Sequence, residues 1–131
     1  MNNGQRKTID KQTRELVYKK YNGHCAYCGC ELKYKDMQVD HFKPIDWASL
    51  RYIDRETEDL NTIDNYMPSC RMCNFYKSTR DIENFRKQFE EIPKRLEKIF
   101  IYRLAIKYGL IVPIKKEIKF YFEKEKLNEI K

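Results

Sequence analysis

Four cysteines arranged in two Cys-x-x-Cys pairs are the residues of this sequence with the clearest chemistry. The pairs are Cys25 with Cys28, and Cys70 with Cys73. Two such pairs can bring four thiolates to one tetrahedral Zn²⁺, whereas a thioredoxin-type redox site needs only one pair. We therefore expect a structural zinc held by all four cysteines. Cys30 is expected to be a buried or idle free thiol, although it is close enough to compete for the metal.

The segment between the two pairs is unusually long and contains an acid beside a histidine. It spans 41 residues, against roughly 15–20 in compact zinc modules. Within it lie Asp40 and His41, in the stretch VDHFKPID. A neutral imidazole with a pKa near ~6.5 can take a proton at neutral pH. The only other histidine, His24, precedes Cys25, and we expect it to be structural or to contact a phosphate, because four cysteines already fill the zinc site.

The N-terminal half predicts one helix, one hairpin and one long loop. Apolar spacing favours a helix over residues 8–21, which Asn22 and Gly23 end. Residues 30–42 resemble a hairpin with strands through Leu32 and Met37 and a turn at residues 35–36. Residues 45–63 are acidic and without a clear period. We interpret them as a long loop with a helical turn, and such loops are more often functional than accidental.

The C-terminal half predicts three helices and a strand. A short helix begins at the second cysteine pair, and a helix over residues 81–89 begins at the capping residue Asp81. A longer helix runs from Pro93 to Gly109, two residue types that mark helix starts and stops. Residues 118–122 alternate apolar and other side chains, which favours a strand.

Composition favours a single globular domain with an acidic partner. The 131 residues carry a net charge of +7, with 14 basic and 9 acidic residues in 79–131. Nucleic acid is the commonest acidic partner, and simple solubility is the alternative. No apolar run approaches the roughly 20 residues of a membrane helix. The start of the sequence lacks the apolar core of a signal peptide, so we expect a cytoplasmic protein, bacterial or phage-encoded.

The order of these motifs resembles the HNH endonuclease family, also called ββα-metal or His-Me finger, in its zinc-knuckle type. The motifs occur in the order Cys25-x-x-Cys28, Asp40-His41, Asp64-Asn65-Tyr66, Cys70-x-x-Cys73-Asn74 and Lys77. The similarity covers roughly residues 21–79. It implies an α+β fold in which a zinc-stapled ββα-metal core, residues 1–80, carries an N-terminal helix. Residues 81–131 are then a helical and β extension of the same domain.

The resemblance also implies catalytic roles. His41 matches the general base, while Asp40 and Asn74 match ligands of a catalytic ion. Their hard oxygen ligands indicate Mg²⁺ or Mn²⁺ rather than Zn²⁺. Asn65 matches the residue that ties the loop together and orients the base, and Lys77 is either a phosphate contact or solvated. Since successive strand residues point to opposite faces, Asp40 and His41 can share a site only where the strand twists or ends.

We therefore predict a metal-dependent endonuclease that hydrolyses phosphodiester bonds in nucleic acid, expected to be double-stranded DNA, and leaves 5′-phosphates. One alternative is a zinc-stabilised nucleic-acid-binding module without catalysis. Another is a nuclease subunit that acts only with a partner such as an ATPase. The apolar face of the helix over residues 93–108 could serve a homodimer or a protein partner.

Overall fold

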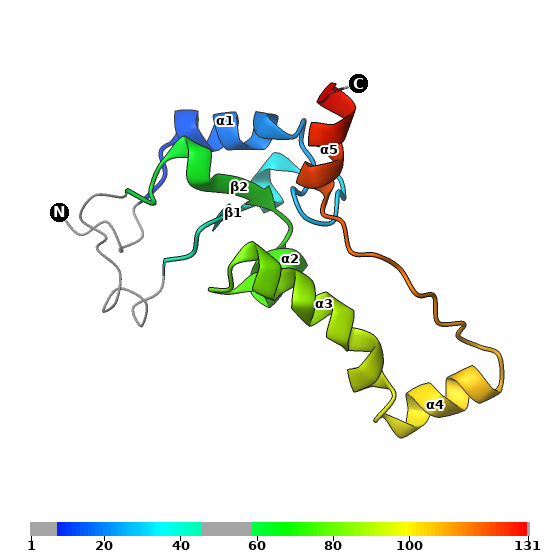
Figure 1. The fold of residues 1–131 in the computed structure, drawn as a ribbon. Coiled ribbons are helices and arrows are strands. Elements are labelled where there is room, and N and C mark those ends of the chain that lie inside the picture. Colours follow the sequence, from blue (N-terminus) through cyan, green and yellow to red (C-terminus); the bar gives the residue numbers. More distant parts are fainter. Residues whose placement is uncertain (1–7, 46–58, 131) are drawn as a thin grey trace.

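The computed structural model describes residues 8–45 and 59–130, which form an α+β fold around a pair of antiparallel strands (Figure 1). The strands are β1 (Gln38–His41) and β2 (Tyr66–Ser69). Helix α1 (Lys11–Lys20) packs against β2, and helix α2 (Arg71–Lys77) packs against β1. Figure 1 shows α1 above the strand pair and α2 below it. The α+β class predicted from the sequence is confirmed.

Helix α1 confirms the predicted N-terminal helix, with slightly shorter bounds. It begins after Asp10, whose side chain accepts a hydrogen bond of 2.7 Å from the backbone N–H of Thr13. Such a cap satisfies one of the free donors of the first turn. Val17 is fully buried, and this side chain fixes the helix on the strand pair.

The predicted hairpin over residues 30–42 is wrong, because β1 pairs with β2 and not with residues 32–34. Residues Tyr34–Asp36 form a 3₁₀ turn, η1, instead of continuing a strand. The Arg14 guanidinium of α1 donates to the carbonyls of Tyr34 and Met37, at 2.8 Å each. These carbonyls therefore bond to a side chain rather than to a neighbouring strand.

Helix α3 (Ile82–Leu96) and helix α4 (Phe100–Lys107) replace the two helices predicted over residues 81–89 and 93–109. Asp81 caps α3 as predicted, accepting 2.8 Å from the N–H of Asn84. Pro93 lies inside α3 and does not begin a helix. It has no N–H to donate one turn back, and α3 ends within the next turn. Gly109, with φ +72°, ends α4 as predicted.

The predicted strand over residues 118–122 is also wrong, since helix α5 (Tyr121–Ile130) begins there. The N–H of Phe120 donates to the Glu123 carboxylate at 3.0 Å. The N–H groups of Tyr121 and Phe122 donate to the carbonyls of Tyr27 and Ala26, at 2.9 and 2.8 Å. The first N–H groups of α5 thus bond to carbonyls between Cys25 and Cys28. A strand at this position would instead need a neighbouring strand to accept these hydrogen bonds.

The core is an aromatic cluster that joins the first cysteine pair to the C-terminal elements. Phe85 of α3 is fully buried, and its ring stacks on that of Phe120 at 5.2 Å. Tyr27 meets both rings edge-on, at 5.5 and 5.8 Å. Arg86 fastens the same segments, because its guanidinium bonds both carboxylate oxygens of Glu123, at 2.8 and 3.0 Å.

Two further predictions concern the long loop and the membrane. Residues 46–58 of the predicted loop lie outside the described residues, and Ile63–Asn65 form the short 3₁₀ turn η3. Lys20 supports this turn, since its ammonium donates to the carbonyls of Ile63 and Tyr66 at 3.1 and 2.8 Å. No helix in the described part of the chain combines the length and apolar character needed to cross a bilayer.

Candidate active site and metal centre

The two cysteine pairs converge on one point, as the sequence predicts. The sulfur atoms of Cys25, Cys28, Cys70 and Cys73 all lie within 4.8 Å of one another. A tetrahedral zinc with Zn–S bonds of about 2.3 Å holds its sulfurs about 3.8 Å apart, and Sγ of Cys28 lies 3.8 Å from Sγ of Cys70. The cluster therefore fits a structural zinc in both ligand chemistry and size.

Local backbone structure places both cysteine pairs. Cys70 is the residue before α2, and its sulfur accepts a hydrogen bond of 3.4 Å from the N–H of Cys73. The first pair is tied to β2, because the N–H of Ala26 donates to the carbonyl of Pro68 at 2.8 Å. Gly29 completes the first turn with φ +81°, a conformation that side chains disfavour.

The thiols of the cluster change one another's pKa. Hydrogen bonding from the Cys73 thiol, followed by backbone N–H groups, lowers the pKa of Cys25, although burial opposes this. A thiolate is the form that binds zinc, so these donors prepare a ligand. Cys30 lies outside the cluster and is exposed. Partial burial, followed by the neighbouring Cys28 thiol, raises the pKa of Cys30 to about 12, which keeps it a thiol.

Asp40 is buried at the junction of β1, α2 and the first cysteine pair. Its side chain is 3% exposed, and Oδ2 pairs with the Lys77 ammonium at 3.0 Å. The same oxygen accepts a hydrogen bond of 2.5 Å from the Tyr27 hydroxyl. Burial, and then the negative charge of Asp40, raises the pKa of Tyr27, so this phenol stays protonated and donates.

Lys77 takes a position that the sequence did not predict. Its side chain is fully buried, and its ammonium also donates to the carbonyl of His41 at 2.9 Å. A side chain with no exposed surface and two internal partners is not available to a phosphate. The predicted nucleic-acid contact of Lys77 is therefore corrected to a buried ion pair that joins α2 to β1.

His41 is the last residue of β1 and is 4% exposed. Its ring lies edge-on to Tyr66, its partner across the strand pair, at 5.3 Å. Its Nε2 lies 3.1 Å from Oδ1 of Asn61. An amide oxygen can only accept, so Nε2 donates, and the basic lone pair of the neutral ring is on Nδ1.

Asn65 joins the end of β1 to the segment before β2. Its amide oxygen accepts 2.8 Å from the N–H of Lys43, and its amide nitrogen donates to the carbonyls of Lys43 and Leu60 at 3.1 and 2.9 Å. Its carbonyl accepts from the N–H of Phe42 at 2.8 Å. These bonds hold the backbone just after His41.

The last two predicted residues lie on separate elements. Asn74 is half-buried on α2, the helix that packs on β1. His24 has a structural position, because its ring stacks on Tyr121 at 5.4 Å and its Nδ1 lies 3.0 Å from the carbonyl of Asn22. The structure thus links Asp40 to Lys77 and places His41 beside Asn61, while Asn74 lies on the neighbouring helix.

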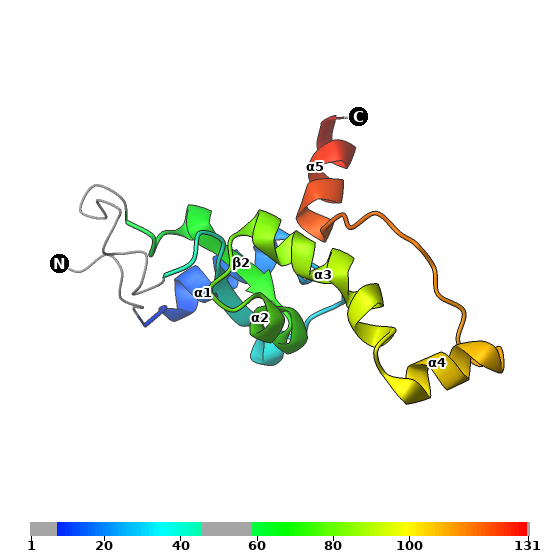
Figure 2. The same ribbon diagram turned by 60° about the horizontal axis from the view of Figure 1, so that its bottom comes forward.

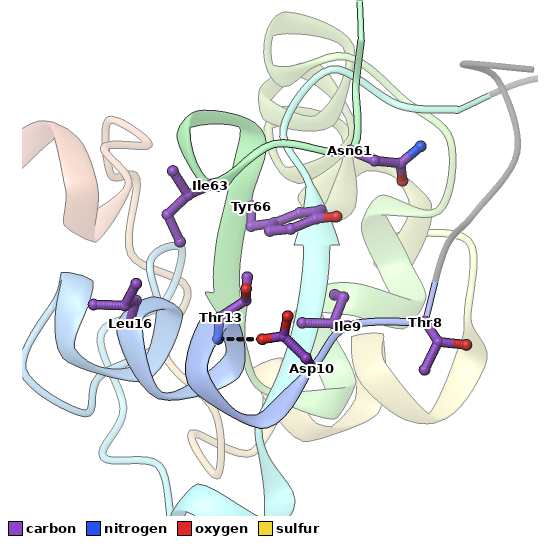
Figure 3. Close-up of a pocket in the computed structure, with 8 residues that line it drawn as sticks. All are labelled: Thr8, Ile9, Asp10, Thr13, Leu16, Asn61, Ile63 and Tyr66. Atoms are coloured by element: carbon purple, nitrogen blue, oxygen red, sulfur yellow. Dashed lines mark hydrogen bonds between the residues drawn. The ribbon is translucent and has the colours of Figure 1, made fainter. Parts of the chain in front are cut away.

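A cleft opens beside the partners of His41, between α1 and the segment that leads into β2 (Figure 3). Asn61 and Tyr66 line one side of it, and Asp10 and Thr13 from the start of α1 line the other. The complete lining is Thr8, Ile9, Asp10, Thr13, Leu16, Asn61, Ile63 and Tyr66. The side chains that hold the imidazole therefore border a concave, partly polar surface.

Sequence reasoning missed Tyr27 and Asn61, and it included Tyr66 only as part of a motif, with no role of its own. Tyr27 is an unremarked residue within the first cysteine pair, and its hydroxyl reaches Asp40 only in the folded chain. Asn61 lies in an acidic segment without periodicity. The one available signal was the Asp64-Asn65-Tyr66 motif, and the position of Tyr66 opposite His41 follows only from the strand pairing.

The comparisons with known proteins agree with this geometry. Residues 25–80 match the family model described as HNH endonuclease. Comparison with curated proteins gave no significant match, and comparison with solved structures gave none either. The matched residues contain both cysteine pairs, both strands and α2. Residues 25–80 of this chain are therefore a domain of the HNH endonuclease family.

Proposed function

We propose that this protein is a metal-dependent endonuclease that hydrolyses phosphodiester bonds in nucleic acid, with His41 as the general base. The observation that carries the proposal is the pairing of His41 with Asn61 at the end of β1, inside a domain of a nuclease family. This pairing fixes the tautomer and orientation of the ring, which a positioned base requires.

His41 would take a proton from the water that attacks the scissile phosphorus. Asn61 holds Nε2 of the ring, and Asn65 holds the backbone that follows the base. The 3′-oxygen then leaves, so the products carry a 5′-phosphate and a 3′-hydroxyl. The positive charge of +7 supports a nucleic-acid substrate held by its phosphates.

Asp40 and Asn74 are the residues that would hold Mg²⁺ or Mn²⁺. A carboxylate and an amide oxygen suit these hard ions, and α2 packs on β1. Lys77 and Tyr27 already engage Oδ2 of Asp40, which leaves Oδ1 for an ion. When bound, the ion would polarise the phosphate and stabilise the charge on the leaving oxygen.

A second candidate is a zinc-stabilised nucleic-acid-binding module without catalysis. Two observations favour it: the Asp40 carboxylate is neutralised by Lys77, and His41 is only 4% exposed. Under this hypothesis both residues serve the stability of the strand pair. The basic surface would still bind phosphates.

Nicking of supercoiled plasmid separates these candidates, using the wild-type chain with Mg²⁺ or Mn²⁺ and two histidine variants. His41→Ala should lower the rate by about 10²–10⁴-fold, the usual contribution of a general base. His24→Ala is the matched control and should cut at a rate close to that of the parent, because His24 packs on Tyr121 away from the strand pair. Zinc content should remain unchanged in His41→Ala, because His41 is not a zinc ligand.

The outcomes have distinct meanings. Parental cutting by His41→Ala refutes the proposed base. A wild-type chain that binds plasmid but never cuts it, with any divalent ion, supports the binding module. Cutting that appears only when a second protein is added supports the subunit hypothesis. Loss of ion dependence in Asp40→Asn or Asn74→Ala, with zinc retained, identifies the ion ligands.

A further inference from the structure

Residues 99–114 form an apolar arm that the rest of the chain does not cover. The arm consists of α4 and the segment that follows it. Eight of its large apolar side chains are exposed, by 44–81%: Ile99, Phe100, Ile101, Tyr108, Leu110, Ile111, Val112 and Ile114. Helix α4 contains no buried residue. In both views of the ribbon, α4 is the element farthest from the strand pair (Figure 1, Figure 2).

The helical part of the arm ends in a regular, hydrogen-bonded C-terminal cap. α4 ends at Gly109, and the N–H groups of Gly109 and Leu110 donate to the carbonyls of Ile106 and Ala105, at 3.0 and 2.9 Å. This pattern satisfies the last carbonyls of the helix. The chain then runs back toward α5 as an extended segment (Figure 2).

The exposed area matches what one protein partner requires. Aromatic side chains present roughly 150–250 Å² each. If the lower end of that range stands for all eight, which are about two-thirds exposed, they offer on the order of 800 Å². A standard interface buries about 800 Å² per partner. Contiguous apolar patches larger than a few hundred Å² mark interaction sites on soluble proteins.

We propose that the apolar arm is a homodimer interface, in which the arm of one chain packs on the arm of a second copy about a two-fold axis. Homodimer interfaces are the most apolar class, and residues 108–114 contain no charged side chain. A two-fold axis needs a self-complementary surface, and aliphatic side chains without fixed charges meet that requirement.

The extended segment of the arm after α4 also favours a second copy of the chain as the partner. Residues 112–117 show no backbone–backbone hydrogen bond within the described chain. They include the β-branched residues Val112 and Ile114, which suit an extended, paired segment. An identical segment running antiparallel across the two-fold axis would supply backbone partners, except at Pro113, which has no N–H.

Charge predicts how salt acts on this dimer. Residues 97–117 carry five basic side chains, Lys98, Arg103, Lys107, Lys115 and Lys116, and two acidic ones, Glu97 and Glu117. Two such arms repel each other, and salt screens the repulsion. The dimer should therefore strengthen as salt rises, whereas binding to an acidic partner protein would weaken.

Sedimentation velocity tests the proposal over low to high micromolar protein, at low and high salt, without any use of nuclease activity. The wild type should reach twice its chain mass of 16.1 kDa. The variant Phe100→Glu with Leu110→Glu should raise the dimer dissociation constant by at least about 100-fold, since each copy would bury two charges in place of apolar groups. Its melting temperature, measured at dilutions where the wild type is a monomer, should match that of the wild type, because both side chains are exposed in the single chain.

Leu16→Glu is the matched control, since Leu16 is an exposed leucine on α1, outside the arm. This variant should dimerise like the wild type. A wild-type chain that stays monomeric at every concentration overturns the proposal. So does a dimer that survives the Phe100→Glu, Leu110→Glu change, or one that weakens as salt rises.

Discussion

Replacing Lys77 with methionine removes the only partner ammonium of the buried Asp40 carboxylate among the described residues. Lys77 has no exposed surface, and its ammonium lies 3.0 Å from Asp40 and 2.9 Å from the carbonyl of His41. Methionine keeps much of the volume but loses both interactions. Breaking a buried pair from one side costs about 3–5 kcal/mol, because the remaining charge stays desolvated. We therefore expect Lys77→Met to lose about 3–5 kcal/mol of unfolding free energy.

A double-mutant cycle isolates the ion pair. Asp40→Asn keeps an acceptor for the Tyr27 hydroxyl and removes the charge. The double variant Asp40→Asn, Lys77→Met should be more stable than Lys77→Met alone, because no unpaired charge remains. Urea unfolding in the presence of zinc measures all four proteins. Lys19→Met, at an exposed lysine of α1, is the control and should change stability by less than about 0.5 kcal/mol.

Two results would refute this reasoning. A loss below about 1 kcal/mol in Lys77→Met is the behaviour of a surface pair and would contradict the burial of Lys77. If Lys77→Met lowered the slope of log K against log salt for DNA binding by about 0.9, Lys77 would contact a phosphate after all.

Four further predictions concern zinc, the backbone, acid and substrate. Cys28→Ser or chelation should release about one zinc per chain and unfold the protein, as circular dichroism and metal analysis would show, whereas Cys30→Ser keeps the metal. Gly29→Ala should cost about 1–3 kcal/mol by urea unfolding, since Gly29 has φ +81° and a Cβ there would lie 2.6 Å from the Tyr121 ring; a stability equal to wild type would contradict the docking of α5. Burial raises the pKa of Glu123, but Arg86 and the Phe120 N–H outweigh it and lower the pKa below 4.5, so Glu123→Gln should be less stable than wild type above that pH, with the difference lost as pH falls through the lowered pKa. Lys115→Glu with Lys116→Glu should flatten the salt slope of DNA binding, by about 0.9 per lost contact, if these lysines touch the duplex.

The zinc cluster was predictable because cysteine spacing carries its own geometry. A Cys-x-x-Cys pair delivers two sulfurs to one point whatever surrounds it, so Cys25 and Cys73 could be assigned without knowing the fold. The cap at Asp81 was predictable for the same reason, since it depends on neighbouring residues alone. His41 and Asn65 were identified from the order of motifs.

The strand pairing was not predictable, because its determinants are distant in sequence. β2 contains Pro68 and is buried along its whole length, so it shows neither alternation nor strong strand propensity. Its partner β1 was therefore assigned to the nearest apolar run. The position of Lys77 was hidden for a similar reason, because lysine is almost never fully buried and only the folded chain brings Asp40 beside it.

The alternation of apolar side chains over residues 118–122 does not correspond to a strand. Ile118, Phe120 and Phe122 alternate because an extended approach leads directly into the first turn of α5, and this short passage imitates a strand. Of the three alternating residues only Phe120 is fully buried, at 3% exposed, while Ile118 and Phe122 are half-buried. The alternation therefore reflects burial of one side chain in the core and not the backbone conformation of a strand.

The bonds from Tyr121 and Phe122 to the carbonyls of Tyr27 and Ala26 have a consequence for how the chain is made in the cell. During synthesis the cysteine pairs and both strands emerge from the ribosome well before residues 118–123. Until those residues emerge, Phe85 lacks the ring on which it stacks, and Tyr27 lacks the same ring, Phe120, which it meets edge-on. The nascent nuclease domain should therefore bind zinc early but become rigid late, so a ribosome stalled before residue 118 would carry a metal-loaded domain that proteases still cut.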